Sequence, residues 1–279
     1  MARAWVAASG RIALAVVLGV VILNPVLLYF LQERLLFYPH GINEENRALI
    51  RGRFPAVREV TVTAGDGTSL HGWFQKSPAA ARAPLLIYFG GNAEDVSFVP
   101  SKGDRVAGWS MLAIAYRGYG LSRGEPGERA LFDDALATYD AFARRDDVDP
   151  ARIAVLGRSL GSGVATYVAA HRPVHAAVLV TPYDSVLEVA RAKFWFVPVG
   201  LILRHRFDSA ILARAIARPA LFVVASEDEV IPVPHARRLY DAWAGPKKWH
   251  VVEGEKHDTI DFNPDYWTVI AAFLAAPTP

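Results

Sequence analysis

The stretch IAVLGRSLGSGVATYVAAHR (residues 153–172) joins a short apolar run to a helix-like segment through a turn rich in glycine and serine. The turn contains GRSLG (157–161), which fits the pattern G-x-S-x-G. Between a strand and a helix, this pattern is typical of a nucleophile elbow, a sharp turn that exposes a serine hydroxyl and needs a glycine on either side. Loops that bind dinucleotides or nucleotide phosphates follow other glycine patterns, and neither occurs here. We therefore predict that Ser159 is a nucleophile.

Apolar runs and helical stretches alternate along the rest of the chain. Strands that are apolar on both faces are typical of parallel sheets covered by helices. Alternation of such strands with helices favours a doubly wound α/β sheet. The runs predicted as strands are 85–89, 111–116, 153–156, 176–180, 220–225 and 249–252, and the clearest helical stretches are 128–145, 234–243 and 262–276.

A different pattern precedes these runs. The segment VREVTVTAGDGTSLHGWFQK (57–76) alternates apolar and polar residues on either side of Gly65-Asp66-Gly67. Such alternation around Asp-Gly predicts an antiparallel hairpin. The sequence thus predicts a mostly parallel, doubly wound α/β sheet with an antiparallel hairpin at its N-terminal side. Ligands of such sheets lie beyond the carboxyl ends of the strands, so the residues after each apolar run are the candidates for chemistry.

The N-terminal segment predicts a membrane anchor. Residues 12–31, IALAVVLGVVILNPVLLYFL, contain no charge and are long enough to cross about 30 Å of hydrocarbon as a helix. We expect one retained transmembrane helix within residues 1–35 and a catalytic domain over 36–279, with a small helical insertion at about 184–210. Arginines 3 and 11 favour a cytoplasmic N-terminus and a catalytic domain on the non-cytoplasmic side. A cleaved signal peptide and a buried core helix are the alternatives.

Composition excludes several classes of function. The 30 Lys and Arg residues nearly balance the 28 Asp and Glu residues, giving a net charge of +2. Without a basic stripe, we expect no nucleic-acid partner. The chain has no cysteine, which excludes disulfides, thiolate metal sites and a cysteine nucleophile. Covalent chemistry must therefore use another side chain.

A serine nucleophile needs a base and an acid that orients the base, and in this architecture they follow in the order Ser, Asp or Glu, His. Asp228 follows the run 220–225, and His257 follows the run 249–252. Both lie in loops beyond strand ends, where the carboxylate can orient the imidazole. We predict a triad of Ser159, Asp228 and His257. Asp184, which also follows a strand, is the second candidate for the acid.

The oxyanion of an acyl-transfer intermediate needs two amide donors. The amide of Leu160, directly after the nucleophile, is the first candidate. The loop after the run 85–89 supplies the second, with Asn92 preferred and Gly91 next. A plain turn into a helix is the alternative interpretation of this loop.

Several motifs together resemble the α/β-hydrolase superfamily. They are GRSLGSG (157–163), YFGGNAED (88–95), AYRGYGLSRGEPGE (115–128), TPYDS (181–185), SEDEVIP (226–232) and the late His257. Within that superfamily they are similar to the membrane-anchored bud-emergence-like and depalmitoylating domain-17 hydrolases. The chain departs from that pattern where it carries Gly90-Gly91-Asn92 instead of His-Gly-Asn. The resemblance implies serine hydrolysis of esters, thioesters or peptides with no metal and no organic cofactor.

We therefore expect hydrolysis of carboxylic esters or thioesters of a small-molecule or lipid-like acyl substrate, through an acyl-enzyme. The apolar part of the insertion, FWFVPVGLIL (194–203), could roof an acyl pocket or dip into the bilayer; a helical pair packed on the sheet is the alternative. Two other functions stay open. One is a peptidase of aminopeptidase type, and the other is a membrane-tethered binding protein that has lost catalysis.

Overall fold

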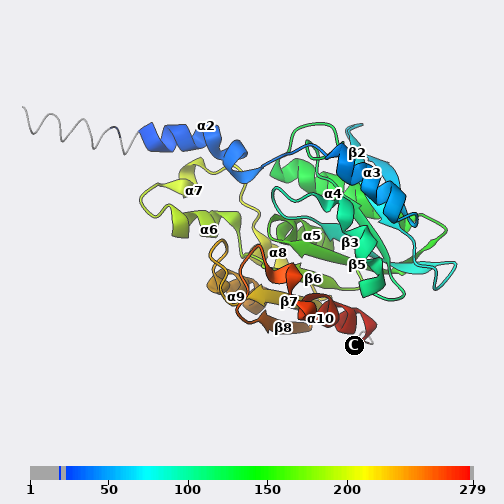
Figure 1. The fold of residues 1–279 in the computed structure, drawn as a ribbon. Coiled ribbons are helices and arrows are strands. Elements are labelled where there is room, and N and C mark those ends of the chain that lie inside the picture. Colours follow the sequence, from blue (N-terminus) through cyan, green and yellow to red (C-terminus); the bar gives the residue numbers. More distant parts are fainter. Residues whose placement is uncertain (1–18, 20–22, 277–279) are drawn as a thin grey trace, which may run out of the picture.

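The computed structural model describes residue 19 and residues 23–276, and within them eight strands form a single mixed sheet (Figure 1). The strand order is β1-β2-β4-β3-β5-β6-β7-β8. β2 is antiparallel to both β1 and β4, and the remaining neighbours are parallel. The predicted sheet is therefore confirmed. Its strands are β1 (Val57–Thr63), β2 (Ser69–Gln75), β3 (Ala83–Phe89), β4 (Ser110–Ile114), β5 (Val148–Arg158), β6 (Ala177–Val180), β7 (Ala220–Ala225) and β8 (Lys247–Val252).

Helices cover both faces of the sheet. One hydrophobic cluster packs α4, α5, α8 and α9 on one face, and a second packs η2 and α10 on the other. Further helices lie before the hairpin and after β6. The helices are α2 (Asn24–Leu36), α3 (Glu44–Arg53), α4 (Glu128–Ala143), α5 (Leu160–His171), α6 (Val186–Lys193), α7 (Val199–Ile202), α8 (Ser209–Ala213), α9 (Val233–Ala242) and α10 (Pro264–Ala275), with 3-10 turns η2 (Val96–Phe98), η3 (Pro100–Arg105) and η4 (Ile260–Phe262).

The central strands are buried on both sides, which explains their uninterrupted apolar sequences. All seven residues of β3 are buried. Successive side chains of a strand point to opposite faces, and accordingly Leu85 and Ile87 join the cluster of α4 and α5, whereas Leu86 and Tyr88 join that of α10. Because β3, β5, β7 and β8 run in the same direction, their carboxyl ends lie at one edge of the sheet.

The hairpin forms where the sequence predicts it. Val57 pairs with Gln75 and Thr63 with Ser69. Gly67 closes the turn at a φ of 84°, a left-handed conformation that favours glycine. The carboxylate of Asp66 accepts from the amide of Thr68 at 2.9 Å.

Half of the predicted membrane span, residues 12–18 and 20–22, lies outside the described residues. Its last part, 24–31, forms the first turns of α2. In the described part of the chain, every helix is too short or too polar to span a bilayer. The anchor and the side of the membrane stay predictions.

α3 is a helix that the strand and helix patterns did not predict. It packs Ile50 against Val57 and Trp73 of the hairpin. Glu59 on β1 completes this contact, because its carboxylate accepts hydrogen bonds from Arg47 (2.9 Å) and from Arg51 (2.6 Å) of α3. Polar pairing thus docks a short helix that buries little apolar surface.

Glu59 should make the docking of α3 depend on pH. Burial alone would raise the pKa of this carboxyl, but hydrogen bonds from Arg47, His71 and Arg51 outweigh burial and lower the pKa to about 2, from 4.5. A carboxyl whose pKa is lower in the folded protein than in the unfolded chain stabilises the fold at pH values above its unfolded pKa. This contribution is lost as the pH falls through the folded pKa. We expect Glu59→Gln to lower the free energy of unfolding by about 2 kcal/mol at pH 7, and by less as pH falls below about 4.5.

Urea unfolding of both proteins from pH 7 down to about 3.5 checks this expectation. A difference that stays constant over this range would mean that Glu59 contributes through packing and not through its charge.

Candidate active site

Ser159 occupies a strained turn between β5 and α5. Its φ is 51° and its ψ is −118°, a conformation that residues other than glycine seldom adopt. The flanking glycines make this possible. A Cβ on Gly157 would lie 2.1 Å from the carbonyl oxygen of Gly161, and a Cβ on Gly161 would lie 2.0 Å from that of Phe89. Both spacings are far inside contact distance, so the turn requires glycine at both positions.

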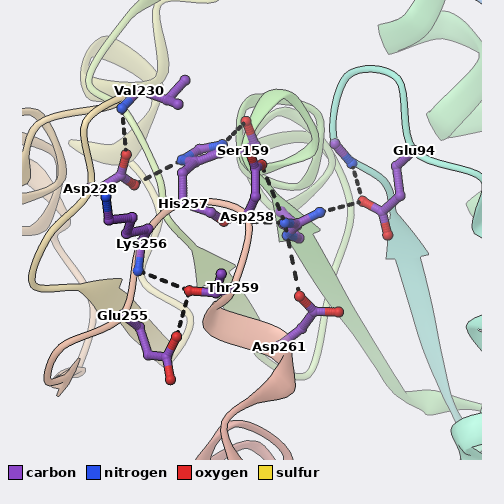
Figure 2. Close-up of polar contacts among 12 residues, drawn as sticks. Glu94, Ser159, Asp228, Val230, Glu255, Lys256, His257, Asp258, Thr259 and Asp261 are labelled. Atoms are coloured by element: carbon purple, nitrogen blue, oxygen red, sulfur yellow. Dashed lines mark hydrogen bonds and ion pairs between the residues drawn. The ribbon is translucent and has the colours of Figure 1, made fainter.

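The structure brings Ser159, His257 and Asp228 together from three separate loops (Figure 2). Nε2 of His257 lies 2.8 Å from Oγ of Ser159, and Nδ1 lies 2.8 Å from Oδ2 of Asp228. The other carboxylate oxygen of Asp228 accepts from the amides of Val230 at 2.9 Å and Ile231 at 2.7 Å. An imidazole protonated on Nδ1 can donate to Asp228 and accept the hydroxyl proton of Ser159.

Asp184, the second candidate for the acid, belongs to a different cluster. Its Oδ1 lies 2.7 Å from Nδ1 of His235, and its Oδ2 accepts from Arg238 of α9. Asp184 and His235 are both buried. This pair ties the start of the insertion to α9, and Asp228 is the carboxylate that contacts His257.

The loop after β3 lies beside Ser159. The amide of Gly91 donates to Oε2 of Glu94 at 2.6 Å, so this amide is already engaged. The side chain of Asn92 accepts from the amide of Tyr38 and from the hydroxyl of Tyr119, both at 2.8 Å, which fixes the loop. Leu160 begins α5, where an amide has no partner inside the helix. Of the two residues predicted from this loop, Asn92, which lines the same cavity as Ser159, therefore remains the candidate for a second donor.

Gly90 stands where the similar hydrolases carry histidine, and the structure gives a reason. A Cβ at this position would lie 2.6 Å from Cγ1 of Val96. The carbonyl oxygen of Gly90 accepts from the hydroxyl of Tyr116 at 2.9 Å. Val96 and Tyr116 thus both contact this loop at Gly90.

A half-buried ionic strap, formed by Glu94 and Arg158, links the loop to His257 and was not predicted from the sequence. Glu94 accepts from the hydroxyl of Tyr88 (2.6 Å) and from Nη1 of Arg158 (3.3 Å). Nη2 of Arg158 donates to the carbonyl oxygen of His257 at 3.1 Å. Burial alone would lower the pKa of Arg158, but the charge of Glu94 and its neighbours raises it, so the side chain stays a cation. The signal in the sequence was the position of Arg158, inside the G-x-S-x-G motif.

An apolar cavity of about 390 Å³ opens at Ser159. Its walls come from α2, from α6 and α7 of the insertion, and from the loop after Asp228. Residues of the insertion thus line a pocket, which agrees with one of the three interpretations given for residues 194–203. The lining residues include Ser159, Leu160, Leu28, Leu36, Val189, Ala190, Phe194, Ile202, Leu203 and Ile231. In the part of the chain that the structure describes, no three His, Asp or Glu side chains gather as a metal site would require.

Comparison with known proteins gives relatives over most of the chain. It is 33% identical over 229 residues to the uncharacterized protein Rv2307c of Mycobacterium tuberculosis, a match that covers 81% of this chain and 80% of that protein. It is 28% identical to the alpha/beta hydrolase domain-containing protein WAV2 of Arabidopsis thaliana, covering 80% of this chain and 79% of WAV2. It is also 28% identical to the lysophosphatidylserine lipase ABHD12 of Danio rerio, covering 74% of this chain and 62% of that lipase. No protein-family model matches the chain.

Solved structures share the fold. The acetyl xylan esterase from Paenibacillus sp. R4 superimposes with a TM-score of 0.64 and 20% identity, over 85% of this chain and 97% of the esterase. At this identity the likeness concerns the fold alone.

The close approach of Gly161 to β3 yields a test of the elbow. Gly161→Ala places a methyl group against the carbonyl oxygen of Phe89, and backbone cannot move aside as a side chain can. We expect a loss of more than about 2 kcal/mol in the free energy of unfolding. Gly65→Ala is the control, because nothing lies within 4 Å of its Cβ. Denaturant unfolding measures both, and equal stability of the two variants would contradict the packing described for the elbow.

Proposed function

The chain belongs to the α/β-hydrolase family, and on this premise we propose that it is a serine hydrolase that cleaves carboxylic ester or thioester bonds of acyl substrates. The observation that carries the proposal is the continuous hydrogen-bonded line from Asp228 through His257 to Ser159, at the wall of an apolar cavity. The lipase activity in the name of ABHD12, a relative that is 28% identical, supports the same class of bond.

The reaction follows from the geometry. Oγ of Ser159 attacks the acyl carbon while Nε2 of His257, 2.8 Å away, takes the hydroxyl proton. Asp228 holds the imidazole through Nδ1 and stabilises the imidazolium that forms. The carbon–oxygen or carbon–sulfur bond then breaks, and His257 returns the proton to the leaving alcohol or thiol. Water, deprotonated by His257, attacks the acyl-enzyme and releases the carboxylic acid and the free serine.

The developing oxyanion requires fixed donors. The amides of Leu160 and Asn92 fill this role in the proposal. Leu160 is at the first turn of α5, where the positive end of the helix dipole adds to its effect. The side chain of Asn92 is held by Tyr38 and Tyr119, which keeps its own backbone in place before substrate binds. Donors that are fixed in advance stabilise the transition state without having to reorganise during the reaction.

The apolar cavity favours substrates with an acyl chain of several carbons. Its lining is predominantly aliphatic, and a pocket of this kind stabilises each buried methylene of a substrate by about 0.8 kcal/mol. The membrane anchor predicted for residues 12–31 belongs to the same proposal. Its support is the uncharged run of twenty residues, which continues into the apolar helix α2.

Replacement of the nucleophile tests the reaction. We expect Ser159→Ala to lower kcat by about a thousandfold or more and to abolish covalent labelling by a fluorophosphonate probe, because no other group can form the acyl-enzyme. Ser162→Ala is the matched control. Ser162 is buried one turn along α5, and its hydroxyl lacks a partner among the described residues. Labelling that persists in Ser159→Ala, or that is absent from folded wild-type protein, would refute the proposal.

The acyl cavity predicts a chain-length profile. For a series of esters with a common leaving group, kcat/KM should rise by about threefold to fourfold per methylene until the cavity is filled. Ala190→Leu, which adds volume to the lining, should flatten this rise and leave short esters unaffected. Ala192→Leu on the exposed side of the same helix is the control. A flat profile for wild-type protein would assign the enzyme to small substrates.

A further inference from the structure

Exposed apolar side chains gather on the two elements that wall the cavity. Leu201 of α7 is 88% exposed and Trp195, between α6 and α7, is 83% exposed. On α2, Phe30 is 71% exposed. We call this set the apolar rim; its members are Leu23, which precedes α2, Val26, Leu27 and Phe30 of α2, and Trp195, Phe196 and Leu201 of the insertion. Large apolar patches on a protein surface mark places where another surface binds.

The first part of α2, residues 25–31, carries no charge and is apolar on both sides. Leu28 packs inward against the cluster of α6 and α7, whereas Leu27 and Phe30 face outward. A helix that is apolar all round is normally buried in protein or in lipid. The outward side of α2 is therefore expected to contact another apolar surface, which none of the described residues provides.

A buried polar clamp makes α2 and the insertion one unit. Oε1 of Gln32 accepts from the amide of Arg204 at 2.7 Å, and Nε2 donates to the carbonyl oxygen of Ile202 at 3.1 Å. Glu33 adds an ion pair with Arg204 at 3.2 Å. α2, α6 and α7 accordingly lie together at one end of the molecule, and α3 lies at the other end (Figure 1). The two halves of the rim are thus held on the same structural unit.

The chemistry of the rim and its place in the chain favour a lipid surface as its partner. The uncharged residues 12–31 run directly into α2, so a chain anchored there would bring the rim to the membrane. Trp and Phe side chains partition into the interfacial region of bilayers. Lys193 and Arg191 lie at the end of α6, where basic side chains can meet lipid headgroups.

We propose that the apolar rim docks on the lipid bilayer and sets the acyl cavity against the membrane, so that acyl substrates reach Ser159 from the bilayer and not from water. The inference that acyl substrates enter from the bilayer rests on the proposed function. The docking itself rests on the rim, on α2 and on the anchor predicted at residues 12–31, and does not depend on the catalytic reaction.

The absence of cysteine from the chain allows a direct test. A single environment-sensitive fluorophore is attached to Leu201→Cys in the full chain, reconstituted in phosphatidylcholine–phosphatidylglycerol vesicles. Leu49→Cys on α3, 47% exposed and at the opposite end of the molecule, is the matched control. We expect brominated lipid, and not iodide in the water, to quench the label at position 201. We expect iodide, and not brominated lipid, to quench the label at position 49.

Two results would overturn the proposal. A label at 201 that iodide quenches as fully as the label at 49 would mean that the rim stays in water. A label at 201 that neither quencher reaches would mean that protein, such as a second copy of the chain, covers the rim. Adding Ser159→Ala to the labelled protein should leave the quenching unchanged, which separates failure of docking from failure of catalysis.

Activity gives a second readout. Trp195→Asp combined with Leu201→Asp should lower kcat/KM by about tenfold for a long-chain ester embedded in vesicles, equivalent to about 1.4 kcal/mol. Neither residue lines the cavity, so hydrolysis of a water-soluble short ester should not change. Leu49→Asp is the control. An equal loss of activity on both substrates would indicate damage to the fold, and the quenching of the labelled proteins would then decide whether the rim docks. Activity of the double variant equal to that of wild-type protein on the vesicle substrate would refute delivery from the bilayer.

Discussion

The close contact between the start of α5 and the end of β3 is the constraint on which the site depends. Gly161 approaches the carbonyl oxygen of Phe89 so closely that no side chain fits, and Gly157 approaches Gly161 in the same way. This contact forces Ser159 into its positive φ and presents its hydroxyl above the sheet. The cost of such a backbone conformation, on the order of 1–3 kcal/mol, has to be offset by the packed core on either side. Strands buried on both faces supply that core.

The same contact joins the elbow to the loop that follows β3, and the ionic strap extends the connection to His257. Glu94 ties the amide of Gly91 to Arg158, and Arg158 ties the elbow to the backbone of His257. This half-buried ion pair adds little net stability, because partial desolvation of its two charges offsets much of their attraction. It does fix geometry, since a buried charge that loses its partner is strongly unfavourable. The strap therefore acts on the alignment of three loops more than on the stability of the fold.

The sequence predicted the parts of the site that follow from local pattern. Two-sided apolar runs indicated the strands, and the residues after them indicated Ser159, Asp228 and His257, which the structure brings within hydrogen-bond distance. It did not predict the partners of Glu94 and Arg158, because these residues are distant in the chain and nothing in their spacing indicates the pairing. From the sequence, Asp184 ranks behind Asp228 only on chain order and loop position. The structure gives the physical reason why Asp184 is not the acid of the triad: its carboxylate is paired with His235 and Arg238. Local patterns identify strand ends, but long-range pairing decides which side chains meet there.

The boundary between the N-terminal segment and the catalytic domain illustrates this limit. A division near residue 35, drawn where the apolar run ends, treats α2 as part of an anchor. In the structure α2 is a wall of the cavity, held by Gln32 to the insertion. A few residues further, the amide of Tyr38 donates to Asn92 in the loop beside Ser159. The segment is thus tied at one end to the roof of the apolar cavity and at the other to the loop after β3. Any motion of α2 relative to the domain would change both the shape of the cavity and the position of Asn92, so the segment that follows the predicted anchor is part of the candidate active site itself.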